Sequence, residues 1–209
     1  MAWTRRLEAF RSAAEAIDPL VDTPTDWSTP GLGTWTVAEL LAHTLRALQT
    51  THDYVMAPQP AGPPTVTAAG YYDAYLTWRA DDPESADALV AGRSQGMVGD
   101  PDDLADRWRR ARGTAVSVVT DAGPDRGVET PFGVLNLHEY LRTRTLELAV
   151  HGLDLARAVG ADGWHPPRVA VADAIALLGE LAVLRADGDQ FLLAMTGRVP
   201  PDEVLPILR

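Results

Sequence analysis

Glu147 and His151 are the residues whose type and spacing most clearly suggest chemistry. They are four positions apart in the segment Leu137–Gly160, whose apolar spacing predicts a long helix. At about 100° per residue, side chains four apart lie one turn apart on the same face. Imidazole and carboxylate groups together suit zinc, nickel or iron(II), so this pair could share one divalent ion. The alternative is an exposed Glu–His pair on a solvated face, which the spacing alone does not exclude.

Arg144 and Asp154 extend this polar stripe by one turn in each direction. Burying ionisable groups without partners costs several kcal/mol, so a stripe of charge within an apolar helix needs an explanation. A metal ion would supply one, with Asp154 orienting His151 through a hydrogen bond. Surface salt bridges are the alternative for both residues.

His43 is a candidate third ligand. Leu40 and Ala47 share its face of a second predicted helix, so the imidazole should point inward. It can meet Glu147 and His151 only if the two helices are neighbours, which a bundle permits. A hydrogen-bonded core histidine is the alternative. Three protein ligands would leave coordination positions open for water or substrate, as in catalytic rather than structural sites.

The other three histidines do not fit this arrangement. His52 lies about 180° around its helix from His43, and His138 lies about 220° from His151. His165 lies between Trp164 and Pro166 in a predicted loop. We expect all three at the surface or in local hydrogen bonds.

Composition excludes several other functions. The chain has 209 residues, 46% of them hydrophobic, which suits one main domain. It has no cysteine, so disulfides, thiolate metal sites and a cysteine nucleophile are excluded, and any thiol must come from outside. The net charge of −11 disfavours nucleic acid as a partner. There is no membrane-spanning run and no signal sequence, so we expect a soluble, cytoplasmic protein. Sequence motifs of serine hydrolases, P-loop NTPases and dinucleotide-binding enzymes are absent.

Helical periodicity dominates the chain, and strand signals are weak, so the predicted fold class is all-α. Thr36 and Glu39 have the spacing of a capping box at a helix start. Trp27 and Trp35 should pin the preceding loop to the bundle. The predicted helices cover residues 3–18, 36–56, 66–79, 102–120, 135–159 and 167–186.

Four shorter segments complete the expected organisation. Residues 81–100 should form short helical pieces and loops, and residues 121–128 a turn. Residues 129–132 should be extended, and residues 190–196 fit either a helix or a strand. The aromatic residues of the 66–79 helix suit either a buried core or a homodimer face.

The segments Trp35–His43 and Arg144–Ala156 together resemble the mycothiol-dependent maleylpyruvate isomerase family, which is one of the DinB-like metalloenzymes. The resemblance implies an all-α, DinB-like four-helix bundle with extra helices and a short C-terminal extension. Residues 1–160 would form the metal-binding bundle, and residues 161–209 a C-terminal helix and short tail packed on it. Within that tail, Leu192–Arg198 resembles part of a C-terminal domain that family members carry.

The same resemblance implies the site and its chemistry. His43, Glu147 and His151 would bind a divalent metal, zinc first and nickel or iron as alternatives, with Arg144 and Asp154 beside the cofactor. Mycothiol would be the cosubstrate, and its metal-bound thiolate would attack a small electrophilic substrate. Release of the adduct would make the protein a transferase, and addition, rotation and elimination would make it an isomerase. The alternatives are a non-catalytic DinB-like protein that binds a metal or ligand, and a metal-dependent hydrolase.

Overall fold

A computed structural model describes residues 2–23, 26–85, 101–185 and 188–203, together with positions 88, 92, 98 and 208. It confirms the predicted all-α class, with two small hairpins added to the helices. The helices are α1 (Trp3–Ala16), α2 (Asp18–Val21), α3 (Val37–Met56), α4 (Ala68–Asp81), α6 (Pro101–Ala122), α7 (Leu137–Ala158), α8 (Arg168–Leu184) and α9 (Gly188–Met195), with a 3-10 turn at Pro201–Glu203.

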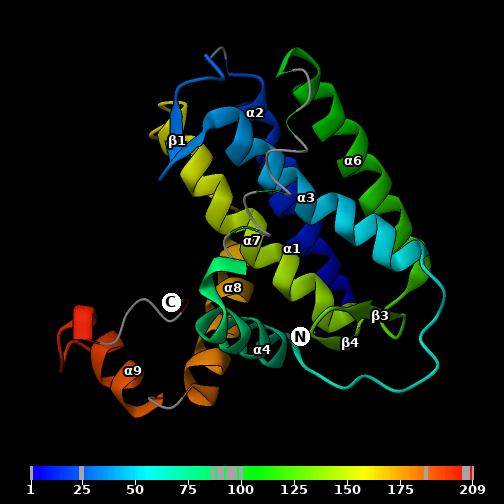
Figure 1. Cartoon of the computed structure of the whole chain (residues 1–209), viewed down its shortest axis with the longest axis vertical. Coiled ribbons are helices and arrows are strands. Elements are labelled where there is room, and N and C mark those ends of the chain that lie inside the picture. The colour runs from blue at the N-terminus through cyan, green and yellow to red at the C-terminus, as the bar shows by residue number, and fades with distance from the viewer. Residues whose placement is uncertain are drawn as a thin grey trace.

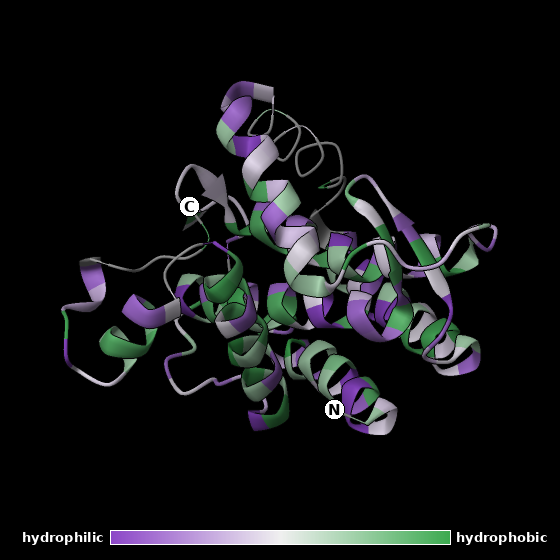
Figure 2. Ribbon diagram, turned by 90° about the horizontal axis from the view of Figure 1, so that it is seen from below, coloured by the Kyte–Doolittle hydropathy of each residue, from purple (hydrophilic) through white to green (hydrophobic). Residues whose placement is uncertain are grey.

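Four helices form the bundle that carries the candidate site. α1 and α3 each pack against both α6 and α7 (Figure 1). Both hydrophobic and hydrophilic residues occur along the helices of the protein (Figure 2). Phe10, Leu41, Trp108 and Tyr140 are almost fully buried between them. Each such side chain stabilises the fold by about 1.5–3 kcal/mol, so these apolar contacts contribute substantially to the stability of the bundle.

The start of α3 is fixed by its own side chains. Thr36 accepts a hydrogen bond from the Glu39 backbone N–H at 3.2 Å, and Glu39 accepts one from the Thr36 N–H at 2.8 Å. This is the predicted capping box, and it satisfies two backbone donors that a helix start leaves free. It sets where α3 begins, and His43 follows two turns later.

α4 and α8 form a second layer on the bundle. α8 packs against α1, α4 and α7, while α9 contacts α8 and projects away from the bundle (Figure 1). Leu76 of α4, Leu146 of α7, and Leu177 and Leu181 of α8 share a smaller apolar cluster. Among the described residues, no helix is both long enough and apolar enough to cross a lipid bilayer.

Two short antiparallel hairpins are the main correction to the sequence-based prediction. They pair β1 (Pro30–Leu32) with β2 (Trp35–Thr36), and β3 (Gly127–Thr130) with β4 (Gly133–Asn136). Strands of two to four residues are too short to show alternation, and neither turn carries an Asn-Gly or Asp-Gly signal.

The β3–β4 hairpin also moves one predicted helix boundary. It occupies part of the predicted 121–128 turn and the predicted start of the 135–159 helix. α7 therefore begins at Leu137, with Asn136 as its cap. The backbone N–H groups of Thr65 and Val66 donate to the carbonyl of Val134, so the hairpin holds the segment leading into α4.

Other boundaries differ less. The first helix was predicted to residue 18 but ends at Ala16, and Pro19 lies in the first turn of the short α2. The 190–196 segment, left open between helix and strand, is largely helix α9. Most of the segment 86–100, expected to form short helical pieces and loops, lies outside the described residues.

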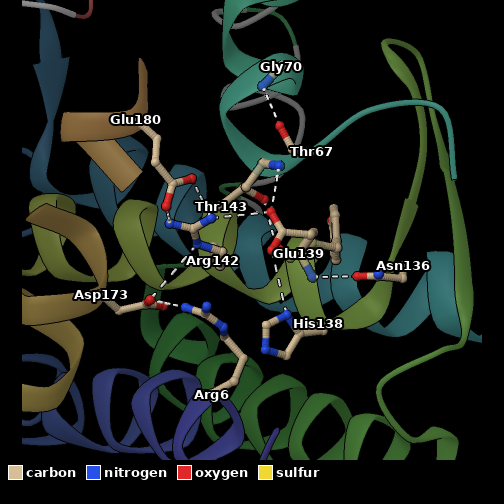
Figure 3. A network of polar contacts seen from close by, with 12 residues as sticks. Arg6, Thr67, Gly70, Asn136, His138, Glu139, Arg142, Thr143, Asp173 and Glu180 are labelled. Atoms are coloured by element: carbon tan, nitrogen blue, oxygen red, sulfur yellow. Dashed lines mark hydrogen bonds and ion pairs between the residues drawn. The ribbon is translucent and has the colours of Figure 1, made fainter. Parts of the chain in front are cut away.

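A buried ion network ties α1, α7 and α8 together (Figure 3). Asp173 of α8 pairs with Arg6 of α1 and lies 4.0 Å from Nε of Arg142 of α7. Arg142 in turn pairs with Glu180 of α8 at 2.6 Å and with Glu139 at 3.3 Å. The side chains of Arg6 and Asp173 are 4% and 1% exposed, so each depends on the other for its charge.

The network also positions α4. Glu139 accepts a hydrogen bond from the Ala68 backbone N–H at 2.9 Å, at the first residue of α4. Thr67 caps the same helix by accepting from the Gly70 N–H (Figure 3). These contacts fix the first turn of α4 against α7, one turn before Tyr72.

Candidate metal centre

His43 of α3 and the pair Glu147 and His151 of α7 meet inside the bundle. One ligand atom from each lies within 4.8 Å of the others. The two imidazole rings are edge to face, with centroids 4.9 Å apart. Adjacent packing of α3 and α7 therefore supplies the link that helix spacing within the sequence did not. The donor set is two imidazoles and one carboxylate, which fits a single divalent ion.

His151 is oriented by two carboxylates on its own helix. Its Nδ1 lies 3.2 Å from Oδ2 of Asp154, and its Nε2 lies 3.3 Å from Oε2 of Glu147. Burial by itself lowers the pKa of His151, but hydrogen bonds with Asp154 and Glu147 raise it to about 9. Asp154 thus holds one ring nitrogen and directs the other toward Glu147, as partners of metal-binding histidines commonly do.

The pKa of His43 shifts in the opposite direction from that of His151. Burial, together with the nearby His151, lowers its pKa to about 4, so the ring is neutral near pH 7. The indole of Trp35 packs on it, with ring centroids 4.7 Å apart. Trp35 was predicted to anchor the loop, and the structure shows it against a candidate ligand.

Glu147 receives a hydrogen bond from another element. The Tyr72 hydroxyl of α4 lies 2.6 Å from Oε1 of Glu147 and 3.2 Å from the Thr143 carbonyl oxygen. Burial raises the pKa of Glu147, but His151, Arg144 and Tyr72 outweigh it and hold this pKa well below the usual range. The carboxylate is therefore ionised near pH 7 and is available to a cation.

A cavity of about 520 Å³ opens beside the three candidate ligands, all of which line it. Much of its wall is aromatic. Phe132, at the turn of the β3–β4 hairpin, contacts Tyr71, Tyr75 and Trp78 of α4, with ring centroids 5.5–5.8 Å apart. The aromatic helix predicted as core or dimer face thus also forms a cavity wall.

Arg144 lines the same cavity. Its guanidinium lies over the rings of Tyr140 and Tyr71, at 5.1 and 5.9 Å from their centroids. Its Nε donates to Oγ1 of Thr143 at 3.0 Å. Within the part of the chain that the structure describes, Arg144 forms no ion pair with a carboxylate. Its charge is the natural partner for an anionic group in the cavity.

The remaining histidines lie apart from this cluster, in local contacts as expected. His52 is exposed and lies 3.0 Å from Asp53, and His138 lies 3.5 Å from Glu139. His165 is exposed in the loop after α7. Within the described ranges, these three belong to no potential metal-binding group.

Sequence reasoning missed two contributions to the site. Tyr72 was grouped with the aromatic residues of its helix, and no sequence signal connected it to Glu147, 75 positions away. Phe132 was placed in an extended segment without a role. Each depends on how a short element docks onto α7, which local spacing does not encode.

Gly152, which follows His151, has a packing role. A Cβ atom there would lie 2.4 Å from the Trp164 ring. Trp164 also donates from Nε1 to the Ala16 carbonyl at 2.7 Å, which joins the loop after α7 to α1. A glycine beside His151 therefore allows this loop to close on the bundle.

Comparison with protein-family models identifies a family for most of the chain. The model of the mycothiol maleylpyruvate isomerase N-terminal domain matches residues 5–156, from α1 to near the end of α7. This chain belongs to that family. The matched region contains every candidate ligand and its neighbours Arg144 and Asp154. Neither the curated proteins nor the solved structures give a match.

Membership of the mycothiol maleylpyruvate isomerase N-terminal domain family implies a bound metal, and the residues present fit one. Two imidazoles, one of them held by a carboxylate, and an ionised glutamate converge at one point beside a cavity. Three protein ligands with an open side are the pattern of catalytic zinc sites.

Proposed function

We propose that this protein is a metal-dependent thiol transferase or isomerase that joins mycothiol to a small electrophilic substrate. The observation that carries the proposal is the convergence of His43, Glu147 and His151 at the wall of the 520 Å³ cavity. Family membership supports the thiol, and the donor set favours zinc, with nickel and iron(II) as alternatives.

The chain's own residues would have distinct tasks. His43, Glu147 and His151 would hold the ion, and Asp154 would keep Nε2 of His151 directed at it. When bound, the ion would act as a Lewis acid that lowers the pKa of an incoming thiol. The chain has no cysteine, so the nucleophilic sulfur would come from the cosubstrate.

The cavity wall indicates what the substrates share. Arg144 would bind an anionic group of a substrate, because its guanidinium faces the cavity without a carboxylate partner among the described residues. Tyr71, Tyr75, Trp78 and Phe132 would pack on an apolar, planar part and exclude water from the reacting atoms.

The test is a thiol-consumption assay on the zinc-loaded protein with mycothiol and a panel of small electrophiles. A thiol adduct would identify a transferase, and a rearranged electrophile with the thiol conserved would identify an isomerase. The His43→Ala variant, carried through the same zinc loading, is the matched control. Absence of thiol-dependent turnover in the wild type would contradict the proposal, and hydrolysis without thiol would favour a metal-dependent hydrolase instead.

A further inference from the structure

Tyr72 belongs to neither helix that carries the candidate ligands, yet its hydroxyl reaches one of them. The side chain is 4% exposed, and its hydroxyl lies 2.6 Å from Oε1 of Glu147. The Thr143 carbonyl oxygen is farther away, at 3.2 Å. A phenol has one proton to donate, so the shorter contact with the charged carboxylate is the stronger hydrogen bond.

The two carboxylate oxygens of Glu147 face different partners. Oε1 is occupied by Tyr72, while Oε2 faces Nε2 of His151 at 3.3 Å. Tyr72 donates this hydrogen bond from α4, outside the helix that carries Glu147. The carboxylate would therefore offer a cation one oxygen, in a fixed orientation.

Contacts between α4 and α7 position the Tyr72 hydroxyl. Glu139 holds the N–H of Ala68, and one turn further on Tyr72 reaches Thr143 and Glu147, which lie one and two turns beyond Glu139 on α7. Successive turns of α4 therefore contact successive turns of α7. The position of Tyr72 thus follows from the docking of α4 against α7.

We infer that Tyr72 is a positioning residue for the metal centre, which holds Oε1 of Glu147 so that only Oε2 is presented together with His43 and His151. The inference rests on the proposed function, because it requires an ion at these three residues. Loss of a hydrogen bond to a metal ligand typically weakens metal affinity 10- to 100-fold.

The experiment compares Tyr72→Phe with Tyr140→Phe and the wild type. Both variants lose one buried tyrosine hydroxyl, but that of Tyr140 bonds to Thr50 and contacts none of the three candidate ligands. Each protein is titrated with zinc against a chromophoric chelator and then with cobalt(II), whose visible d–d bands report coordination geometry. Thermal unfolding of the metal-free proteins checks that each is folded.

We expect zinc affinity to fall 10- to 100-fold in Tyr72→Phe, with altered cobalt band positions and intensities, and both to stay near wild type in Tyr140→Phe. Wild-type affinity and spectrum in Tyr72→Phe would overturn the inference and leave the proposed function standing. An equal loss of zinc affinity in both variants would also overturn the inference, because the loss of any buried tyrosine hydroxyl would then explain the effect. No zinc binding by the wild type would overturn the proposed function and the inference together. If Tyr72→Phe does not fold, Tyr72→Met gives the same measurement, since methionine also lacks the donor and fills irregular space.

Discussion

α7 carries two polar clusters that differ in how their charges are satisfied. Near its start, Glu139 and Arg142 form ion pairs that also draw in Arg6, Asp173 and Glu180 from α1 and α8 (Figure 3). Each basic and acidic side chain there lies in an ion pair with an opposite charge, and the two central side chains, Arg6 and Asp173, are almost fully buried. This cluster joins α1, α7 and α8.

The second cluster, two turns later on the same helix, lines a cavity. Glu147, His151 and His43 converge there, with Glu147 3.3 Å from His151, and Arg144 faces the cavity without an ion pair to a carboxylate among the described residues. One helix thus carries a network of ion pairs that joins elements of the fold and, two turns later, a candidate binding site whose residues line a cavity.

The largest expected effect is on stability, from Asp173→Ala in the first cluster. Arg6 would be left without its buried partner, and burial together with Arg142 already lowers the pKa of Arg6 to about 10. Breaking a buried pair costs about 3–5 kcal/mol, which for a chain of this size lowers Tm by roughly 6–20 °C. Urea or thermal unfolding measures it.

The control is Glu180→Ala, whose carboxylate is 49% exposed and should contribute about 1 kcal/mol or less. Zinc affinity of folded Asp173→Ala should stay near that of the wild type. If it collapsed along with stability, the two clusters would not be separable as described.

The second prediction removes a candidate ligand. His43→Ala should weaken zinc binding by about 3 kcal/mol, roughly 100- to 1,000-fold, which is the share of one ligand in typical zinc affinities. His52→Ala is the matched control on the same helix, because His52 is exposed and contacts Asp53. Calorimetric titration of both variants measures the difference, and similar affinities would remove His43 from the site.

A smaller effect should follow from Asp154→Ala, which leaves every candidate ligand in place. Nδ1 of His151 would lose the carboxylate that orients the ring, and zinc affinity should fall about 10- to 100-fold. Asp53→Ala removes a carboxylate from His52 in the same way and should leave the affinity unchanged. An unaltered affinity in Asp154→Ala would reduce Asp154 to a surface ion-pair partner.

The last prediction concerns pH, with an expected change in zinc affinity of about tenfold for each pH unit. Hydrogen bonds with Asp154 and Glu147, opposed by burial, raise the pKa of His151 to about 9, and zinc must displace that proton. Zinc affinity should therefore rise about tenfold per pH unit between pH 6.5 and 8.5. The folding stability of the metal-free protein should instead fall as pH rises. A pKa raised on folding contributes stability below pH 6.5, which is lost as pH rises through about 9.

Unfolding is measured with and without zinc at pH 6.5 and at pH 9. These measurements test whether zinc affinity rises with pH and whether the stability of the metal-free protein falls. His43, with its pKa lowered to about 4, adds only about 0.4 kcal/mol of stability as pH rises above 6.5, where its imidazole loses the rest of its proton in the unfolded chain. If the metal-free protein instead gained stability between pH 6.5 and 9, the described pairing of His151 with its two carboxylates would be contradicted.

Much of the fold was predictable, because each long helix carries its own periodicity and caps. The Thr36–Glu39 capping box and the adjacency of Glu147 and His151 are local properties that spacing alone determines. Spacing within a helix gives angles about its own axis only. It could not place His43 opposite Glu147, and the family resemblance supplied that expectation.

What the sequence could not predict are contacts between distant elements. Arg6 and Asp173 are 167 positions apart, and Tyr72 and Glu147 are 75 apart. The β3–β4 hairpin was missed because its strands are four residues long, yet it places Phe132 in the cavity wall. These features depend on how short elements dock onto α7, which is decided by tertiary packing.

The most direct test of the central claim is anomalous diffraction from crystals grown with zinc, recorded on both sides of the zinc absorption edge. One zinc peak coordinated by His43, Glu147 and His151, with none at the Arg6–Asp173 network, is the predicted result. A map without a peak at these three residues, or with the strongest peak at another site, would contradict the claim that this cluster is the metal centre.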